Sequence, residues 1–235
     1  MEQRNMGKLG RCTRFFCNAL DKIEKISIKT MLDIGCGEGR TLDLTDRFSG
    51  ATRIGADINM KSLKKAKEKC LAVLASGKTL PFKREKLDLI MEFHTFHHIP
   101  GYEGAVREVG RCLKDGGYFV LVEAVNDNPL FAVMRRVHPV AKEMPIESNF
   151  KFQDLLNTLK ENEFSVEKHE RFGLIFELTL GAVPGMPFFI RKVTGFLDSA
   201  LEKVFGTRFC ASCVIVARKR KNTYETCEKI HGKKY

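Results

Sequence analysis

The chain has 235 residues, 43% of them hydrophobic, which suits one domain with a substantial core and some additions. Forty lysines and arginines against 29 acidic residues give a net charge of +11, which favours contact with polyanions or anionic lipid but says little about chemistry. The eight cysteines lack the clustered spacing of a disulfide framework, and the polar start precedes no signal-peptide core, so we expect a reduced, cytoplasmic protein rather than a secreted disulfide scaffold.

Apolar runs alternate with amphipathic patterns along the chain. The periodicity predicts, in order, an amphipathic helical segment within residues 1–26, a strand over 29–35, a helix over 40–48, a strand over 51–57, a helix over 60–70 and a weak strand over 71–75. It then predicts a strand over 87–93, a helix over 102–113, a strand over 115–125, a helix over 151–162, a strand over 165–172 and a last strand near 209–217. This alternation favours an α/β fold with a mostly parallel sheet.

A glycine-rich turn follows the first predicted strand, in "MLDIGCGEGR" (31–40). Dinucleotide folds use G-x-G-x-x-G, whereas Gly35, Gly37 and Gly39 are one residue too tightly spaced. Asp33 stands two residues before the first glycine, where it would repel a pyrophosphate and attract a cationic amino or sulfonium group. Asp57 ends the second predicted strand, where a carboxylate can accept two hydrogen bonds from a ribose diol. The turn therefore suits a cofactor without phosphates.

In order and spacing, five segments of the chain resemble the class I S-adenosylmethionine-dependent methyltransferases. They are "LDIGCGEG" as the first motif, "IGADIN" as the ribose-binding second strand, "TLPF" (79–82) beside the adenine, "LDLIMEFHTFHHI" as the fourth strand and its loop, and "VGRCLKDGGYFVLVE" as the helix, turn and fifth strand. The likeness covers residues 28–126 and is closest to the small-molecule subgroup that includes the ubiquinone and menaquinone methyltransferases. It implies a Rossmann-like sheet of seven strands with helices on both faces, closed by an antiparallel pair of final strands, and S-adenosylmethionine as cofactor.

The resemblance assigns cofactor binding to one set of residues, namely Asp33, Gly35, Cys36, Gly37, Gly39, Asp57, Ile58, Ser76, Gly77 and Glu92. The glycines bring the backbone close to the methionine part, Asp33 orients its amino group, and Asp57 orients the ribose hydroxyls. The subgroup usually has an acidic residue five positions before the proline of "LPF", where this chain has Ser76 followed by Gly77. The Ser76 hydroxyl or the backbone at Gly77 would then recognise the adenine. No metal site is predicted.

Methyl transfer from a sulfonium is an in-line displacement with an activated leaving group, so alignment and exclusion of water are the main tasks. A base is needed only where the acceptor is a hydroxyl or a protonated amine. His97 and His98, in "HTFHHIP" after the fourth predicted strand, are the candidates for that base. The competing interpretation is that one of the pair only packs against the cofactor loop.

The acceptor stays open in the sequence. Glu92-Phe93-His94 stands where methyltransferases of nucleic-acid or protein nitrogens commonly carry Asn or Asp followed by two prolines, which favours a small-molecule acceptor. The net charge and the "RKRK" run at 218–221 keep RNA as the alternative partner. A third hypothesis is a cofactor-binding scaffold without catalysis. No oligomeric state is predicted.

We expect one domain, with a cofactor-binding half over 27–126, an acceptor-side half over 127–217 and a basic tail over 218–235. An insertion at about 173–206 separates the last two strands, and its apolar first half is interrupted by a charge and prolines, so a full membrane span is not expected. Its second half carries an apolar helical stripe, made of Phe189, Val193, Phe196, Ala200, Leu201 and Val204. This helix is either a cap packed on the sheet edge or a lid that lines an apolar acceptor pocket and touches an anionic membrane.

Overall fold

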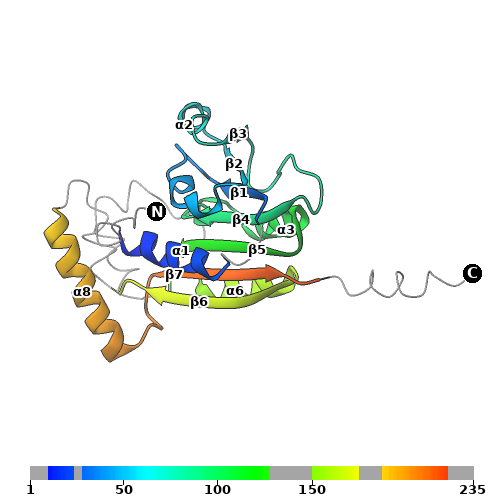
Figure 1. The fold of residues 1–235 in the computed structure, drawn as a ribbon. Helices are drawn as coiled ribbons and strands as arrows, with labels where there is room; N and C mark the ends of the chain where they lie inside the picture. Colours follow the sequence, from blue (N-terminus) through cyan, green and yellow to red (C-terminus); the bar gives the residue numbers. More distant parts are fainter. Residues whose placement is uncertain (1–9, 24–27, 128–149, 175–186, 222–235) are drawn as a thin grey trace, which may run out of the picture.

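The computed structural model describes residues 10–23, 28–127, 150–174 and 187–221 (Figure 1). Its centre is a seven-stranded sheet in the order β3-β2-β1-β4-β5-β7-β6. The strands are β1 (Thr30–Ile34), β2 (Thr52–Asp57), β3 (Leu71–Leu74), β4 (Leu87–Phe93), β5 (Leu113–Ala124), β6 (Phe164–Phe172) and β7 (Ser212–Lys219). β7 runs antiparallel to both β5 and β6, and the other neighbouring pairs are parallel. The expected Rossmann-like sheet with its closing antiparallel pair is confirmed.

Helices cover both faces of the sheet, as expected. They are α1 (Arg11–Lys22), α2 (Met60–Ala66), α3 (Glu103–Cys112), α6 (Phe152–Glu161) and α8 (Phe188–Phe205). On one face, Val106 of α3 and Leu155 of α6 join a buried cluster with Ile90 of β4. On the other face, Phe16 of α1 joins a cluster with Met91 of the same strand. Because its strands bury side chains on both faces, the parallel half of the sheet has nearly continuous apolar runs in the sequence.

The helix expected over residues 40–48 is replaced by two short 3-10 turns, η2 (Leu42–Leu44) and η3 (Asp46–Phe48). Thr45 lies between them and donates its hydroxyl to the Leu42 carbonyl oxygen at 2.7 Å. Such a local side-chain bond competes with the α-helical pattern of backbone bonds. One apolar side chain of each turn is still buried. The prediction of one continuous helix over residues 40–48 was therefore wrong.

The strands that run parallel end at one edge of the sheet, so the loops after β1, β2 and β4 begin there. This edge also receives α8, which lies beside the end of β6 (Figure 1). The Glu202 carboxylate of α8 accepts a hydrogen bond from the backbone N–H of Gly173, just past β6, at 2.7 Å. The cofactor motifs and the helix of the insertion therefore share one edge.

The apolar stripe of α8 is exposed, contrary to the interpretation of this helix as a cap packed on the sheet edge. Phe189 and Phe196 are each 73% exposed, and the alternative of a lid that touches an anionic membrane stays a prediction. The apolar first half of the insertion falls in residues 175–186, outside the described part of the chain. None of the described helices is both long enough and apolar enough to cross a membrane.

The basic run at 218–221 begins inside β7, which continues to Lys219. Arg218 donates from Nε to the Gly116 carbonyl oxygen at 3.1 Å, and Lys219 donates from Nζ to the Leu113 carbonyl oxygen at 3.0 Å. Arg220 also donates to a backbone carbonyl, at 3.2 Å. These three cations contact the protein's own backbone. Residues 222–235 lie outside the described part.

Candidate cofactor site

The loop after β1 contains three glycines in the left-handed region of backbone conformation. Gly35, Gly37 and Gly39 have φ angles of +70°, +51° and +77°. A Cβ at Gly35 would lie 2.1 Å from Thr95 Oγ1, so the loops after β1 and β4 meet where no side chain fits. Any other residue at these positions would strain the backbone. The glycine turn is therefore a tightly constrained element.

Asp57, at the end of β2, ties this loop to the next one. Its Oδ2 accepts a hydrogen bond from Gly37 N at 2.8 Å, and its Oδ1 accepts one from Asn59 N at 2.7 Å. Asn59 in turn caps α2 through its side-chain oxygen. Each carboxylate oxygen keeps a second lone pair, so Asp57 can still accept hydroxyl donors from a ligand.

Asp33 is a buried carboxyl with no protein partner in the described structure. It is 1% exposed, and neither of its two oxygens accepts a hydrogen bond from a described residue. Burial, and after it the negative charge of Asp57, raise the pKa of Asp33 to about 8. Leaving a buried acceptor unmet is costly, and a ligand that brings a cationic donor removes that cost. The residues present therefore fit a cofactor with an ammonium group at this position.

Cys36 and Ile58 differ in what they can offer a ligand. The Cys36 side chain is buried against Leu63 and Ala66 of α2. Its expected contact with the cofactor stays a prediction. Ile58, directly after Asp57, is 77% exposed and offers an apolar surface on which a flat ring can lie.

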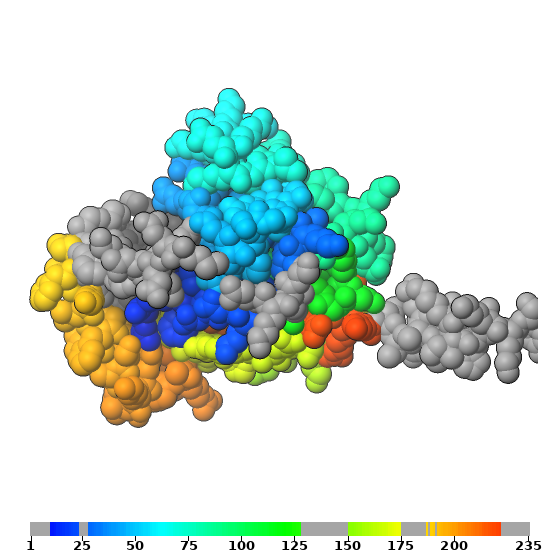
Figure 2. All heavy atoms as spheres, in the orientation of Figure 1, coloured from blue at the N-terminus to red at the C-terminus, as the bar shows by residue number. Residues whose placement is uncertain are grey.

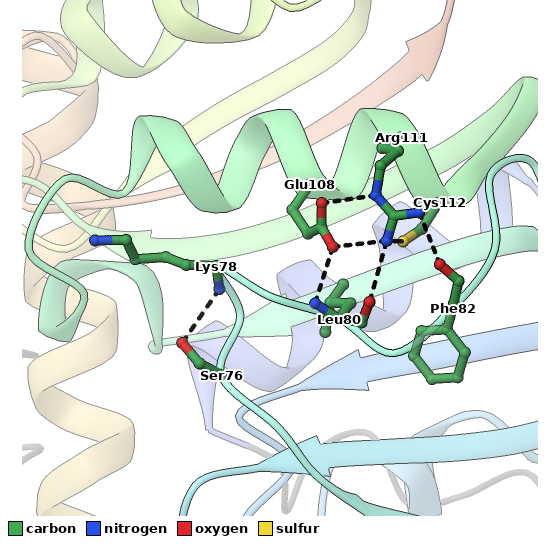
Figure 3. Close-up of polar contacts among 7 residues, drawn as sticks. All are labelled: Ser76, Lys78, Leu80, Phe82, Glu108, Arg111 and Cys112. Atoms are coloured by element: carbon green, nitrogen blue, oxygen red, sulfur yellow. Dashed lines mark hydrogen bonds and ion pairs between the residues drawn. The ribbon is translucent and has the colours of Figure 1, made fainter.

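The segment after β3, which we expect beside the adenine, forms hydrogen bonds with two side chains of α3 (Figure 3). Glu108 Oε1 accepts a hydrogen bond from Leu80 N at 2.9 Å, while Arg111 donates to the carbonyl oxygens of Leu80 at 3.1 Å and Phe82 at 2.7 Å. Glu108 and Arg111 also form a salt bridge, which lowers the pKa of Glu108. Sequence reasoning missed this pair, although an acid and a base three residues apart on a helix were the available signal.

Ser76 and Gly77 lie at the start of that segment. Ser76 is exposed, and its Oγ accepts a hydrogen bond from Lys78 N at 3.3 Å (Figure 3). Gly77 is buried, and a Cβ there would lie 3.1 Å from side-chain atoms of both Ile34 and Ile99. The backbone at Gly77 therefore runs close to the end of β1, and its contact with the adenine stays a prediction.

A second cluster lies on the other face of the sheet, under the turn η4 (Phe96–His98). The fully buried Glu123, at the end of β5, accepts hydrogen bonds on Oε1 from Phe96 N at 2.6 Å and His97 N at 3.3 Å. Its Oε2 lies 2.6 Å from His97 Nδ1. Burial acts to raise the pKa of Glu123, but the hydrogen bond and charge of His97 outweigh it and hold the value at about 2. A proton on Nδ1 bonded to this carboxylate leaves His97 Nε2 as an acceptor. The sequence analysis assigned no role to Glu123.

Glu92 belongs to this second cluster rather than to the glycine loop. In the register of β1 and β4 it pairs with Ile34, the neighbour of Asp33, so the Glu92 and Asp33 side chains leave the sheet on opposite faces. Glu92 Oε1 accepts a hydrogen bond from Thr95 N at 2.6 Å. Burial, and after it the charge of Glu123, raise the pKa of Glu92 well above its usual range. Its place in the structure is under the loop that follows β4.

His94 and His98 flank this cluster. His94 is half-buried with a left-handed φ of +56°, and burial lowers its pKa, whereas His98 is exposed. Donor atoms of His94, His97 and Glu123 lie within 4.8 Å of one another. However, the 2.6 Å between His97 Nδ1 and Glu123 Oε2 is a hydrogen-bond distance, shorter than the roughly 3.3 Å between neighbouring ligands around zinc. The geometry favours a hydrogen-bonded pair over a metal site.

The part of the chain that contains the site is similar to known methyltransferases. Residues 32–121 match the family model described as a methyltransferase domain. The chain is 28% identical over 120 residues to a sterol 4-C-methyltransferase of Caenorhabditis elegans, covering 48% of this chain and 36% of that protein. It is 28% identical over 110 residues to the phthiotriol/phenolphthiotriol dimycocerosates methyltransferase of Mycobacterium tuberculosis, covering 44% of this chain and 41% of that protein. The chain therefore spans less than half the length of these curated relatives.

The fold comparison extends further along the chain. The crystal structure of a SAM dependent methyltransferase from Archaeoglobus fulgidus superposes with a TM-score of 0.62 at 22% identity, covering 89% of this chain and 95% of that one. At this identity the match shows a shared fold, which includes the strands beyond the matched domain.

Proposed function

We propose that this chain, of which residues 32–121 match a methyltransferase domain, is a class I S-adenosylmethionine-dependent methyltransferase that transfers a methyl group to a small lipid-like acceptor. The buried, unpartnered carboxyl of Asp33 is the observation that carries the proposal. S-adenosylmethionine has a cationic amino group and no phosphate, so it relieves a burial cost that a dinucleotide would increase. When bound, it supplies a methyl group already activated for displacement.

The residues around the glycine loop divide the work of holding this cofactor. Asp33 holds the amino group, and Asp57 accepts the ribose hydroxyls through its remaining lone pairs. Ile58 covers one face of the adenine, and the backbone at Gly77 borders its edge. Glu108 and the rest of the α3 support keep the adenine segment in place. This arrangement aligns the reacting groups, which is the main catalytic task in a displacement of this kind.

His97 adds proton transfer where the acceptor requires it. Its Nδ1 bond to Glu123 leaves Nε2 to accept a proton from an acceptor hydroxyl or ammonium group. The buried Glu123 carboxylate then stabilises the imidazolium that results. Because Glu123 pairs with His97 while His98 is exposed, His97 is the better supported of the two candidate bases.

The acceptor class rests on the relatives and on the basic run. One relative is named for a sterol acceptor and another for dimycocerosates, which supports a lipid-like acceptor. A lipid acceptor requires access to a membrane, so a cytoplasmic protein in peripheral membrane contact is part of the proposal. RNA is the weaker alternative, because Arg218, Lys219 and Arg220 donate to backbone carbonyl groups of the protein itself.

Two experiments test the proposal. Calorimetry is expected to show binding of S-adenosylmethionine and S-adenosylhomocysteine, and comparable binding of NAD would refute the cofactor assignment. Incubation with labelled S-adenosylmethionine and fractionated extract is expected to place label in the lipid fraction. Label in RNA alone would establish the alternative acceptor. Cofactor binding with no label in any fraction would indicate a non-catalytic scaffold.

A further inference from the structure

α8 turns its polar side toward the protein body. Thr194 is 6% exposed and Asp198 is fully buried. Glu202, one turn further along, accepts a hydrogen bond from Gly173 N and forms an ion pair with Arg11 of α1. These residues follow one another at four-residue steps, so they form a single inward-facing line on the helix. A helix packed on a hydrophobic core has the opposite orientation.

The opposite side of α8 is an apolar strip, here called the outer face, made of Phe189, Val193, Phe196, Leu197, Ala200 and Val204. Phe189 and Phe196 are each 73% exposed, and Val204 is 75% exposed. Their spacing of three, four and seven or eight residues places them along one side of the helix. α8, drawn in yellow and orange, stands at the margin of the molecule (Figure 1, Figure 2). A contiguous exposed strip of large apolar side chains marks an interaction surface.

The charges beside the outer face are basic. Lys192 and Lys203 are exposed and border the strip, whereas both acidic residues of the helix, Asp198 and Glu202, lie on the inward-facing line. The chain as a whole carries a net charge of +11. Two copies of the chain meeting through this face would bring like charges together, while an anionic surface complements them.

The position of α8 relates this face to the cofactor site. The end of β6, which α8 contacts, lies at the same sheet edge as the end of β5, because both strands run antiparallel to β7. α8 therefore lies on the side of the sheet where the parallel strands end, which is also the side of the glycine loop and η4. Since none of the described helices can span a bilayer, a lipid contact along the outer face would lie in the plane of the interface.

We propose that the outer face of α8 lies on an anionic lipid bilayer, with its phenylalanines at the level of the acyl chains and its lysines against the headgroup phosphates. The choice of a bilayer as partner rests in part on the proposed lipid-like acceptor. Vesicle binding nevertheless tests it without any methyl transfer.

The test is co-sedimentation of the full chain with vesicles of phosphatidylcholine alone or of an equimolar mixture of phosphatidylcholine and phosphatidylglycerol. We expect binding to the anionic vesicles, and a partition coefficient at least about tenfold lower for Phe196→Ser/Val204→Ser. Lys192→Gln/Lys203→Gln should lower it several-fold and weaken its salt dependence. Leu71→Ser, at a 61% exposed apolar position on the distant edge strand β3, is the matched control and should bind as the parent protein does.

Thermal melting checks that each variant folds, which the exposure of the substituted side chains leads us to expect. Equal vesicle binding by the parent and by Phe196→Ser/Val204→Ser would overturn the proposal, as would equal binding to neutral and anionic vesicles. A dimer that this variant dissociates, with no vesicle binding, would assign the outer face to a second copy of the chain. Binding of RNA in place of vesicles, lost in the lysine variant, would likewise overturn it. None of these outcomes alters the proposed methyl transfer, which cofactor titration and label transfer test separately.

Discussion

Replacing Asp33 with asparagine is expected to change how the stability of the protein depends on pH. Burial, and after it the charge of Asp57, raise the pKa of Asp33 to about 8 in the folded chain, from an ordinary value of 3.8. Between these two values the folded protein keeps a proton that the unfolded chain releases, so the free energy of unfolding falls as the pH rises. Each pH unit corresponds to about 1.4 kcal/mol. From pH 5 to pH 7, Asp33 therefore lowers the free energy of unfolding by about 3 kcal/mol.

Asparagine has no proton to release in this range. The stability of Asp33→Asn relative to the parent should therefore rise by about 3 kcal/mol between pH 5 and pH 7, whatever constant cost the buried amide adds. Urea titrations of the ligand-free proteins at pH 5, 6 and 7 measure this difference. Asp43→Asn replaces a carboxylate whose side chain is 53% exposed, and as the matched control it should follow the parent curve in parallel.

The same variant should bind S-adenosylmethionine at least about a hundredfold more weakly, because removing one partner of a buried charge pair costs roughly 3–5 kcal/mol. Calorimetry at pH 7 measures this loss. A stability difference that stays constant from pH 5 to pH 7 would refute the reasoning that Asp33 holds a proton in the folded state. Unchanged cofactor affinity would show that the amino group is bound elsewhere.

Three further predictions concern the loops around the site. Gly35→Ala and Gly37→Ala each place a residue with a side chain in the left-handed backbone region, which lowers the free energy of unfolding by about 1–2 kcal/mol. Only a side chain at Gly35 would also collide with the neighbouring loop, so Gly35→Ala should melt at the lower temperature, and equal melting temperatures would contradict that contact. Asp57→Ala should weaken S-adenosylmethionine binding by about 1–3 kcal/mol in calorimetry, and an unchanged affinity would exclude Asp57 as the ribose ligand. His97→Gln should lower turnover far more than cofactor binding, with a smaller loss at high pH where the acceptor ionises unaided; parallel losses of stability and activity would indicate a packing role instead.

The parts of the fold that could be predicted from sequence are those with a local cause. The left-handed turn at Gly35 follows from a run of glycines, since only glycine adopts that conformation freely. The strands β1 and β4 follow from apolar runs of strand length. The exchange of a helix for two 3-10 turns near Thr45 could not be predicted in this way, because one side-chain bond outweighs the apolar spacing there.

The parts that could not be predicted depend on which elements meet. The hydrogen bond between Leu80 N and Glu108 Oε1 joins residues 28 positions apart, and Glu123 of β5 binds the η4 turn that follows β4. The apolar stripe of α8 shows which side chains share a face, but not whether that face turns inward. The contacts of Glu202 with Arg11 and Gly173 decide which side of α8 faces the protein, and the apolar periodicity of the helix does not predict these contacts.

Two segments beside the cofactor site, residues 80–82 and the η4 turn, are held in place by hydrogen bonds to their backbone groups. Glu108 and Arg111 bond N–H and carbonyl groups between residues 80 and 82, and Glu123 bonds N–H groups of the η4 turn. These hydrogen bonds involve backbone groups of the two segments, whereas the bond between Glu123 Oε2 and His97 Nδ1 involves a side chain. Substituting an exposed side chain of these segments, such as His98, would leave the backbone hydrogen bonds in place. The backbone path of the site is thus held by side chains that lie outside the segments whose path they fix.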